Sequence, residues 1–170
     1  MRLRRRPRLP VEARAALGVE AGERVLAAAE VSDGTWVVAT DRALLRPGLR
    51  VPWASASHAE WDDDASLLTI DELGDGTRAP RSHRIELLEP GLLPETVHER
   101  VVASIVVSRH VRLHDRSGVR VVARRSPGSD DLRWQVVVDA GLDPDEARVR
   151  AVADRLLTDL RREVGDAPVA

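Results

Sequence analysis

The stretch from Gly34 to Asp71 constrains the fold more than any other part of the chain. Short apolar runs alternate there with polar turns, which is typical of a meander of antiparallel strands. It contains three of the four tryptophans, Trp36, Trp53 and Trp61. In and just before this stretch we predict strands at residues 23–31, 36–40, 43–46, 50–53, 56–61 and 66–71. The alanine run inside 23–31 fits a helix equally well, and nothing in the stretch is a catalytic signature.

The apolar spacing changes from strand-like to helical further along the chain. Residues 81–88 alternate as another strand, and Pro94 then suits the first turn of a helix that the spacing extends to Val107. Strands are predicted again at residues 110–114, 119–125 and 133–139. A long amphipathic helix follows, with a capping sequence at residues 143–146 and an apolar face that continues to Val164. The pattern predicts an α+β fold.

Composition limits the classes of function. The 170 residues include no Lys, Cys, Phe, Tyr or Asn, and all 26 basic residues are Arg, which indicates a GC-rich, bacterial genome. The absence of cysteine excludes disulfides, a thiolate nucleophile and a Cys-based zinc site. The formal net charge is −2, and because the five arginines of residues 2–8 contribute +5, the rest of the chain carries −7. An acidic body of this kind is a poor general binder of phosphate.

Residues 1–10 form a basic segment that we predict to be a disordered tail. It offers contacts to anionic lipid or to phosphate through its arginines, which are Arg2, Arg4, Arg5, Arg6 and Arg8. No aromatic residue lies among them, so the stacking element of single-strand binders is missing and no specific nucleic-acid binding is expected. The segment lacks the apolar core of a signal peptide, and no apolar run approaches the ~18 residues of a spanning helix. We therefore expect a soluble, cytoplasmic protein.

Candidate catalytic and metal-binding groups are few. Asp62, Asp63 and Asp64 are consecutive, and three consecutive carboxylates in a strand turn do not all face one ion, so we interpret them as a solvated turn. His110 and His114 share one strand face but stand roughly 13 Å apart, too far to share a metal. No nucleophile elbow, phosphate loop or dinucleotide fingerprint is present, and we predict no cofactor.

A resemblance to a known family rests on the order of the segments. Residues 36–45, Trp-Val-Val-Ala-Thr-Asp-Arg-Ala-Leu-Leu, are followed by Arg-Val-Pro-Trp at 50–53 and by a hairpin at 59–70. With the helix at 94–107, this order resembles the bacterial pleckstrin-homology-like (PH-like) domains over about residues 20–107. The resemblance implies a split β-barrel with a capping helix over residues 11–107. The basic lipid-binding loop of membrane-targeting relatives is absent, so the resemblance implies a fold rather than a ligand.

Residues 108–170 have no place in a single domain of that family. They form a predicted β-β-β-α extension that either enlarges the first sheet or makes a second small lobe. As function we predict a non-enzymatic binding or scaffolding module that acts through protein–protein contacts or self-association. The tryptophans suit the core, and Trp53 and Trp61 are the two with neighbours that suit an exposed interaction surface. The alternatives are a small-molecule or lipid carrier with an apolar cavity under the C-terminal helix, an anionic membrane-surface module acting through the tail, and an unrecognised hydrolase.

Overall fold

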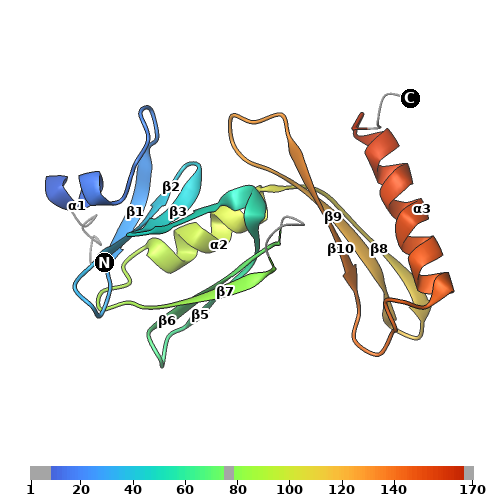
Figure 1. Cartoon of the computed structure of the whole chain (residues 1–170). Coiled ribbons are helices and arrows are strands. Elements are labelled where there is room, and N and C mark those ends of the chain that lie inside the picture. The colour runs from blue at the N-terminus through green and yellow to red at the C-terminus, as the bar shows by residue number, and fades with distance from the viewer. Residues whose placement is uncertain (1–8, 75–78, 167–170) are drawn as a thin grey trace, which may run out of the picture. The chain divides into compact units, whose positions relative to one another are not determined.

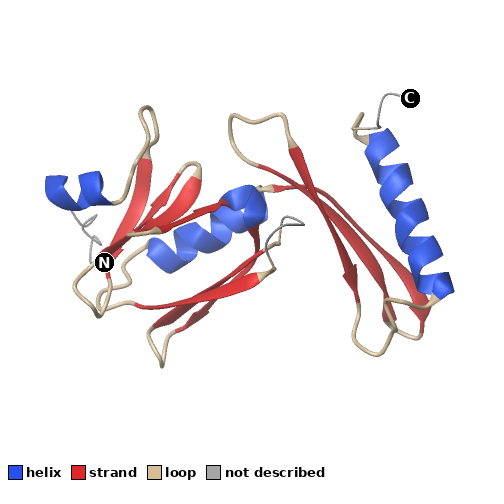
Figure 2. Cartoon of the chain, in the orientation of Figure 1, coloured by secondary structure: helices blue, strands red, loops and turns tan. Residues whose placement is uncertain are grey.

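A computed structural model describes residues 9–74 and 79–166 of the chain. The chain divides into two compact units, which we call unit 1 and unit 2 (Figure 1). Unit 1 comprises residues 1–104 with 126–129, and unit 2 comprises residues 105–125 with 130–170. Among the described residues, unit 1 combines two antiparallel sheets with helices, and unit 2 combines one antiparallel sheet with one helix (Figure 2). The α+β class predicted from the sequence is confirmed.

Unit 1 contains two antiparallel sheets joined by a short 3-10 helix. The first has the order β1-β2-β3-β4, with strands β1 (Val25–Glu30), β2 (Trp36–Thr40), β3 (Ala43–Arg46) and β4 (Leu49–Pro52). The second has the order β5-β6-β7, with strands β5 (Ala56–Asp62), β6 (Leu67–Glu72) and β7 (Arg81–Glu86), and η1 (Trp53–Ser55) lies between the sheets in the chain. The alanine run lies in β1, so its helical alternative is wrong. Within the described residues β4 and β5 are not paired, and the sheets do not close into a barrel.

The main core of unit 1 lies between its sheets and helix α2 (Leu93–Ala103), which runs between them in Figure 1. The helix buries Leu93, Val97 and Val101 against β1, β2 and β5, with Pro94 in its first turn as predicted. Trp53 is the largest fully buried side chain, at 1 % exposed. A chain without Phe or Tyr fills most of this space with Val, Ala and Leu, so one indole carries a large share of the packing.

The first sheet is buried on both faces. Its second face packs against the segment around α1 (Val11–Ala16), through Leu17 together with Ala28, Val38 and Leu45 of the strands. A sheet covered on both faces needs apolar residues at consecutive positions rather than at alternate ones. This explains why β1 and β2 are almost continuously apolar.

The end of α2 differs from the prediction. The helix stops at Ala103, Ser104 caps its last turn by donating its hydroxyl to the carbonyl of Val101 at 2.6 Å, and a strand begins at Ile105. The residues predicted to continue the helix to Val107 are β-branched and serve a strand better than a helix. Residues 105–107 therefore extend the next strand.

Unit 2 is a three-stranded antiparallel sheet with one long helix on it. The order is β10-β9-β8, and the elements are β8 (Ile105–His114), β9 (Ser117–Arg125), β10 (Leu132–Val138) and α3 (Ala147–Glu163). The helix buries Val149, Ala153, Leu156 and Leu160 against the sheet, where Val119 and Val121 of β9 meet them. The predicted apolar face of the C-terminal helix is thus confirmed.

The start of α3 lies later than the capping sequence predicted. The helix begins at Ala147, and its N-cap residue Glu146 makes no side-chain capping bond. Asp143 instead accepts a hydrogen bond from the backbone N–H of Asp145 at 2.9 Å, which forms a turn before the helix. Aspartate favours such local turns as readily as it favours caps, and here the turn is the outcome.

Gly118 of β9 yields a stability prediction. A Cβ at this position would collide with the carbonyl oxygen of Val111 and lie 2.8 Å from the Cα of Arg112, both backbone atoms of the paired strand β8. We expect Gly118→Ala to lower the free energy of unfolding by about 3 kcal/mol, the upper end of the overpacking range. Urea unfolding measures the loss, and hydrogen exchange should show it in β8 and β9. Ser108→Ala, at an exposed position of β8, serves as the control, and equal stability of the two variants would contradict the prediction.

Candidate functional site

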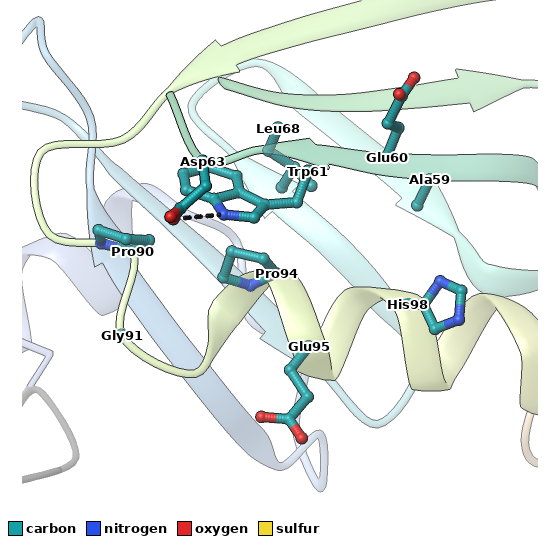
Figure 3. A pocket seen from close by; sticks show the side chains of 10 residues that line it. All are labelled: Ala59, Glu60, Trp61, Asp63, Leu68, Pro90, Gly91, Pro94, Glu95 and His98. Carbon is teal, nitrogen blue, oxygen red and sulfur yellow. Dashed lines mark hydrogen bonds between the residues drawn. The ribbon is translucent and has the colours of Figure 1, made fainter. Parts of the chain in front are cut away.

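A pocket of about 380 Å³ lies in unit 1 between β5 and the start of α2. Its walls come from the strand pair β5–β6 on one side and from the turn before α2, with the first turns of that helix, on the other (Figure 3). The lining residues are Ala59, Glu60, Trp61, Asp63, Leu68, Pro90, Gly91, Pro94, Glu95 and His98. We call this pocket the Trp61 groove.

The floor and one wall of the Trp61 groove are apolar and fixed by the core. Ala59 and Leu68 are buried core residues, and the partly buried Trp61 packs against the same cluster. Figure 3 shows the indole ring beside Pro90 and Pro94. Proline has few torsions to lose on binding, so these rings make a rigid apolar surface next to the indole.

The aspartate hairpin after β5 holds this surface in place. Asp63 accepts a hydrogen bond from the indole N–H of Trp61 at 3.2 Å, drawn as the dashed line in Figure 3. Asp62 accepts one from the backbone N–H of Ala65 at 3.0 Å, which closes the turn toward β6. The two carboxylates therefore have separate structural roles. No group of three or more His, Asp or Glu side chains in residues 9–74 and 79–166 is placed to hold a metal ion.

The charge around the groove is negative. Glu60, Asp63 and Glu95 are exposed, and no arginine among the described residues lines the groove. In Figure 3 the carboxylates of Glu60 and Glu95 point away from the indole in opposite directions, and the Asp63 carboxylate lies beside it. The described residues of unit 1 hold eight arginines against sixteen Asp and Glu residues, so the wider surroundings have the same sign. A negative site with an aromatic wall attracts cationic groups, and a guanidinium stacks on such a ring more readily than a compact ammonium does.

An ion pair between a buried carboxylate and a partly exposed arginine forms a second polar cluster, at one end of the first sheet. Glu23 is 3 % exposed, and its carboxylate accepts hydrogen bonds from the Thr40 hydroxyl at 2.5 Å and from both Arg50 guanidinium nitrogens at 3.2 Å. Burial by itself raises the pKa of Glu23, but the bonds from Thr40, from the backbone N–H of Glu20 and from Arg50, with the charge of Arg50, outweigh it and lower that pKa. These partners leave no oxygen of the carboxylate facing an open site, so the cluster stabilises the fold.

The Thr-Asp-Arg turn used in the family resemblance belongs to this second cluster. The Thr40 hydroxyl accepts hydrogen bonds from the backbone N–H groups of Arg42 and Ala43, and Asp41 accepts one from the N–H of Arg24 at 2.9 Å. The turn thus joins β2 to β3 and ties both to the chain before β1.

The histidines do not converge. His98 lines the Trp61 groove, His83 contacts Glu72 at 3.0 Å, and His110 contacts Asp139 at 2.7 Å. His114 lies on the same strand as His110 but contacts Asp115 at 3.4 Å. Asp139 also accepts the backbone N–H of Gly118 at 2.8 Å, and the bonds from His110 and Gly118 lower the pKa of Asp139. Each of these His–carboxylate contacts is therefore a separate pair.

The two tryptophans predicted for an interaction surface have different positions. Trp53 is buried in the core and its indole N–H donates to the carbonyl of Thr40 at 3.0 Å, so its assignment to a surface is wrong. The adjoining Pro52 ends β4 and η1 turns the indole inward, whereas an extended continuation was predicted. Trp61 lines the groove. The tail residues Arg2, Arg4, Arg5, Arg6 and Arg8 lie outside the described residues.

The second half of the groove was missed by sequence reasoning. Pro90, Gly91, Glu95 and His98 come from a turn and a helix about thirty residues after Trp61. Pro90 and Gly91 are residue types that favour a turn, but only the packing of α2 on β5 brings this turn to the tryptophan.

Two further findings bear on the class of protein. Among the helices of residues 9–74 and 79–166, none is both long and apolar enough to cross a membrane. Comparisons of the chain with protein-family models, with curated proteins and with solved structures find no match.

Proposed function

We propose that the protein is a non-enzymatic binding module, and that the Trp61 groove accepts an arginine side chain carried on an extended segment of a partner protein. The observation that carries the proposal is the combination of an indole, two prolines and three exposed carboxylates around one concave site. Extended segments are commonly recognised by aromatic and proline-lined grooves, with charged side chains at the rim selecting the partner.

The size of the groove supports a side-chain site rather than a cofactor site. A volume of about 380 Å³ is near the lower end of the roughly 300–1,000 Å³ typical of small-molecule pockets. Such a space suits one long side chain with parts of its neighbours. The guanidinium would stack on Trp61 near the Asp63 carboxylate, with Glu60 and Glu95 as more distant charges at the rim that attract it. Stacking of this kind contributes about 0.5–2 kcal/mol, depending on solvent exposure.

We further propose that unit 1 is a PH-like domain. Four strands in one sheet, three in the next and a helix directly after them, in that chain order, support the assignment. The resemblance of residues 36–45 and 50–53 supports it as well. A cytoplasmic location remains a prediction from the sequence.

The other predicted functions have less support. α3 packs directly on its sheet through Leu156 and Leu160, whereas a carrier requires apolar space between the two. The separate His–carboxylate pairs give no support to a hydrolase. A membrane-surface role through the tail depends on residues outside the described part of the chain.

Nuclear magnetic resonance of the Trp61 indole N–H tests the proposed function. The probe is a mixture of seven-residue peptides with a fixed central Arg, compared with the same mixture carrying a central Glu. We expect the Arg mixture to shift the Trp61 indole signal, which a Trp61→Phe variant identifies among the four indole signals, and the Glu mixture to leave it unchanged.

Charge variants give the matched control. Glu60→Gln with Glu95→Gln should weaken binding of the Arg mixture about two- to thirty-fold, because each exposed charge interaction contributes about 0.2–1 kcal/mol. Glu30→Gln with Glu86→Gln removes two exposed carboxylates of unit 1 that do not line the groove, and should leave binding unchanged. Equal weakening by both pairs, or equal shifts from both mixtures, would contradict the groove as an arginine site.

A further inference from the structure

Strand β8 of unit 2 forms an edge of its sheet. The order β10-β9-β8 pairs it with β9 on one side only, and its ten residues make it the longest strand of the described residues. An edge strand presents unpaired backbone N–H and C=O groups, onto which another extended chain can add by continuing the hydrogen-bond ladder. The regular run from Val107 to Arg112, free of the register shifts at its ends, provides about six residues for such pairing.

The formally charged side chains of β8 are all basic. The strand carries Arg109 and Arg112 and no Asp or Glu at any of its positions. Arg109 lies on the face that α3 covers and contacts Glu163 of that helix at 2.9 Å. Arg112 lies on the opposite face, is exposed, and makes no ion pair within the described residues. The central strand β9 adds Arg120, which is paired with His110 and is also exposed.

Side chains on the edge are held in a fixed arrangement. His110 contacts Asp139, and Asp139 also accepts the N–H of Gly118, so a carboxylate from the end of β10 reaches across β9 to β8. The imidazole is therefore already engaged, and Arg112 is the arginine of β8 that makes no ion pair with any described residue. A preorganised edge loses little conformational entropy when a partner strand is added.

We propose that β8 is a docking edge for an extended, acidic segment of a partner protein. Side chains on directly opposed strands lie about 4.5–5.5 Å apart, so Asp or Glu on the added strand would come within reach of Arg112. Charge complementarity therefore selects an acidic strand and rejects a basic one. Single-stranded nucleic acid is disfavoured because β8 carries no aromatic side chain on which bases stack. This surface is independent of the Trp61 groove, and with it the protein would bind two partners of opposite charge.

Peptide binding to the full chain tests the docking edge. The probe is a labelled peptide, Thr-Glu-Val-Glu-Val-Glu-Thr, compared with the same sequence carrying Lys for Glu, and with a third in which proline replaces the central Glu. We expect fluorescence anisotropy to show binding of the Glu peptide only, since the Lys peptide is repelled and proline removes a ladder hydrogen bond. Hydrogen exchange should slow in β8 on binding and stay unchanged in unit 1.

Two variants separate the docking edge from general charge attraction. Arg112→Gln should weaken binding of the Glu peptide about three- to ten-fold, whereas Arg150→Gln, an exposed arginine of α3, should not change it. The proposal is overturned if the proline peptide binds as well as the Glu peptide, if both variants weaken binding equally, or if an acidic oligonucleotide competes as well as the unlabelled Glu peptide. It is also overturned if β8 becomes protected with rising protein concentration alone, which would show a second copy of this chain on the edge.

Discussion

Replacing Trp53 with alanine is expected to lower the free energy of unfolding by about 3–5 kcal/mol, the range for removing a large aromatic side chain from a core. The indole is 1 % exposed and lies among small Val, Ala and Leu side chains. Because these side chains are short, they can fill little of the cavity that removal of the ring leaves. For a chain of this size the loss corresponds to a fall in the melting temperature of roughly 6–20 °C.

Urea unfolding followed by circular dichroism measures this effect, and two variants separate its parts. Trp53→Phe keeps most of the volume but removes the indole N–H that donates to Thr40, so it should cost about 1–3 kcal/mol. Trp36→Phe, at a partly buried position at the start of β2, should cost less than Trp53→Phe. A loss below about 1 kcal/mol for Trp53→Ala would show that the ring is not a main support of unit 1.

Replacing Glu23 with alanine is expected to lower the free energy of unfolding by about 3 kcal/mol, because it removes a buried carboxylate that accepts hydrogen bonds from Thr40, Glu20 and the partly exposed Arg50. The backbone N–H of Glu20 loses its acceptor, the Thr40 hydroxyl keeps only the carbonyl of Ala43 at 3.0 Å, and the guanidinium of Arg50 keeps Glu20 at 3.5 Å. Glu23→Gln retains the shape and part of the bonding, so it should cost less. The exposed Glu12→Gln is the matched control, and its unfolding free energy should stay within about 0.5 kcal/mol of the parent protein.

The contribution of Glu23 should also depend on pH in a defined direction. Its pKa in the folded protein lies below the ordinary value of 4.5, so the ionised carboxylate stabilises the fold. That contribution is fully present well above pH 4.5 and is lost as the pH falls through the lowered pKa. The difference in unfolding free energy between the parent protein and Glu23→Gln should therefore be constant from pH 6 to 8 and shrink below about pH 4.5. A difference that stays constant down to pH 3 would show that ionisation of Glu23 does not matter.

Much of the fold could be read from local sequence pattern. The alternation and the turn residues of residues 36–71 placed the strands within about two residues, and the apolar stripe from Val149 to Leu160 identified the buried face of α3. Such signals are local because strand and helix periods repeat over a few residues. The errors occurred at helix ends, where Ile105 and Asp143 each suit two local structures and tertiary packing decides between them.

The candidate site could be predicted only in part. Trp61 was identified as a surface residue by the acidic turn that follows it. Trp53 was assigned to a surface because it follows Pro52, but a proline before an aromatic residue does not determine whether the ring lies in the core or at the surface. The opposite wall of the groove depends on how α2 packs on β5, which is information from residues about thirty positions apart. Nothing in the local sequence indicated that Glu23 is buried. A single carboxylate before an alanine-rich strand looks like a surface residue until Thr40 and Arg50 are brought to it.

The hydrogen-bonded triad of His110, Gly118 and Asp139 has a consequence for how unit 2 selects its strand alignment. The Asp139 carboxylate, in the segment after β10, contacts a side chain of β8 and a backbone N–H of β9, so it links the two strand pairs of the sheet. Sliding either hairpin by one residue would turn every side chain to the opposite face and would separate this carboxylate from at least one of its two donors. The triad is therefore complete only when both strand pairs are in the native alignment, so its hydrogen bonds favour that alignment over a shifted one.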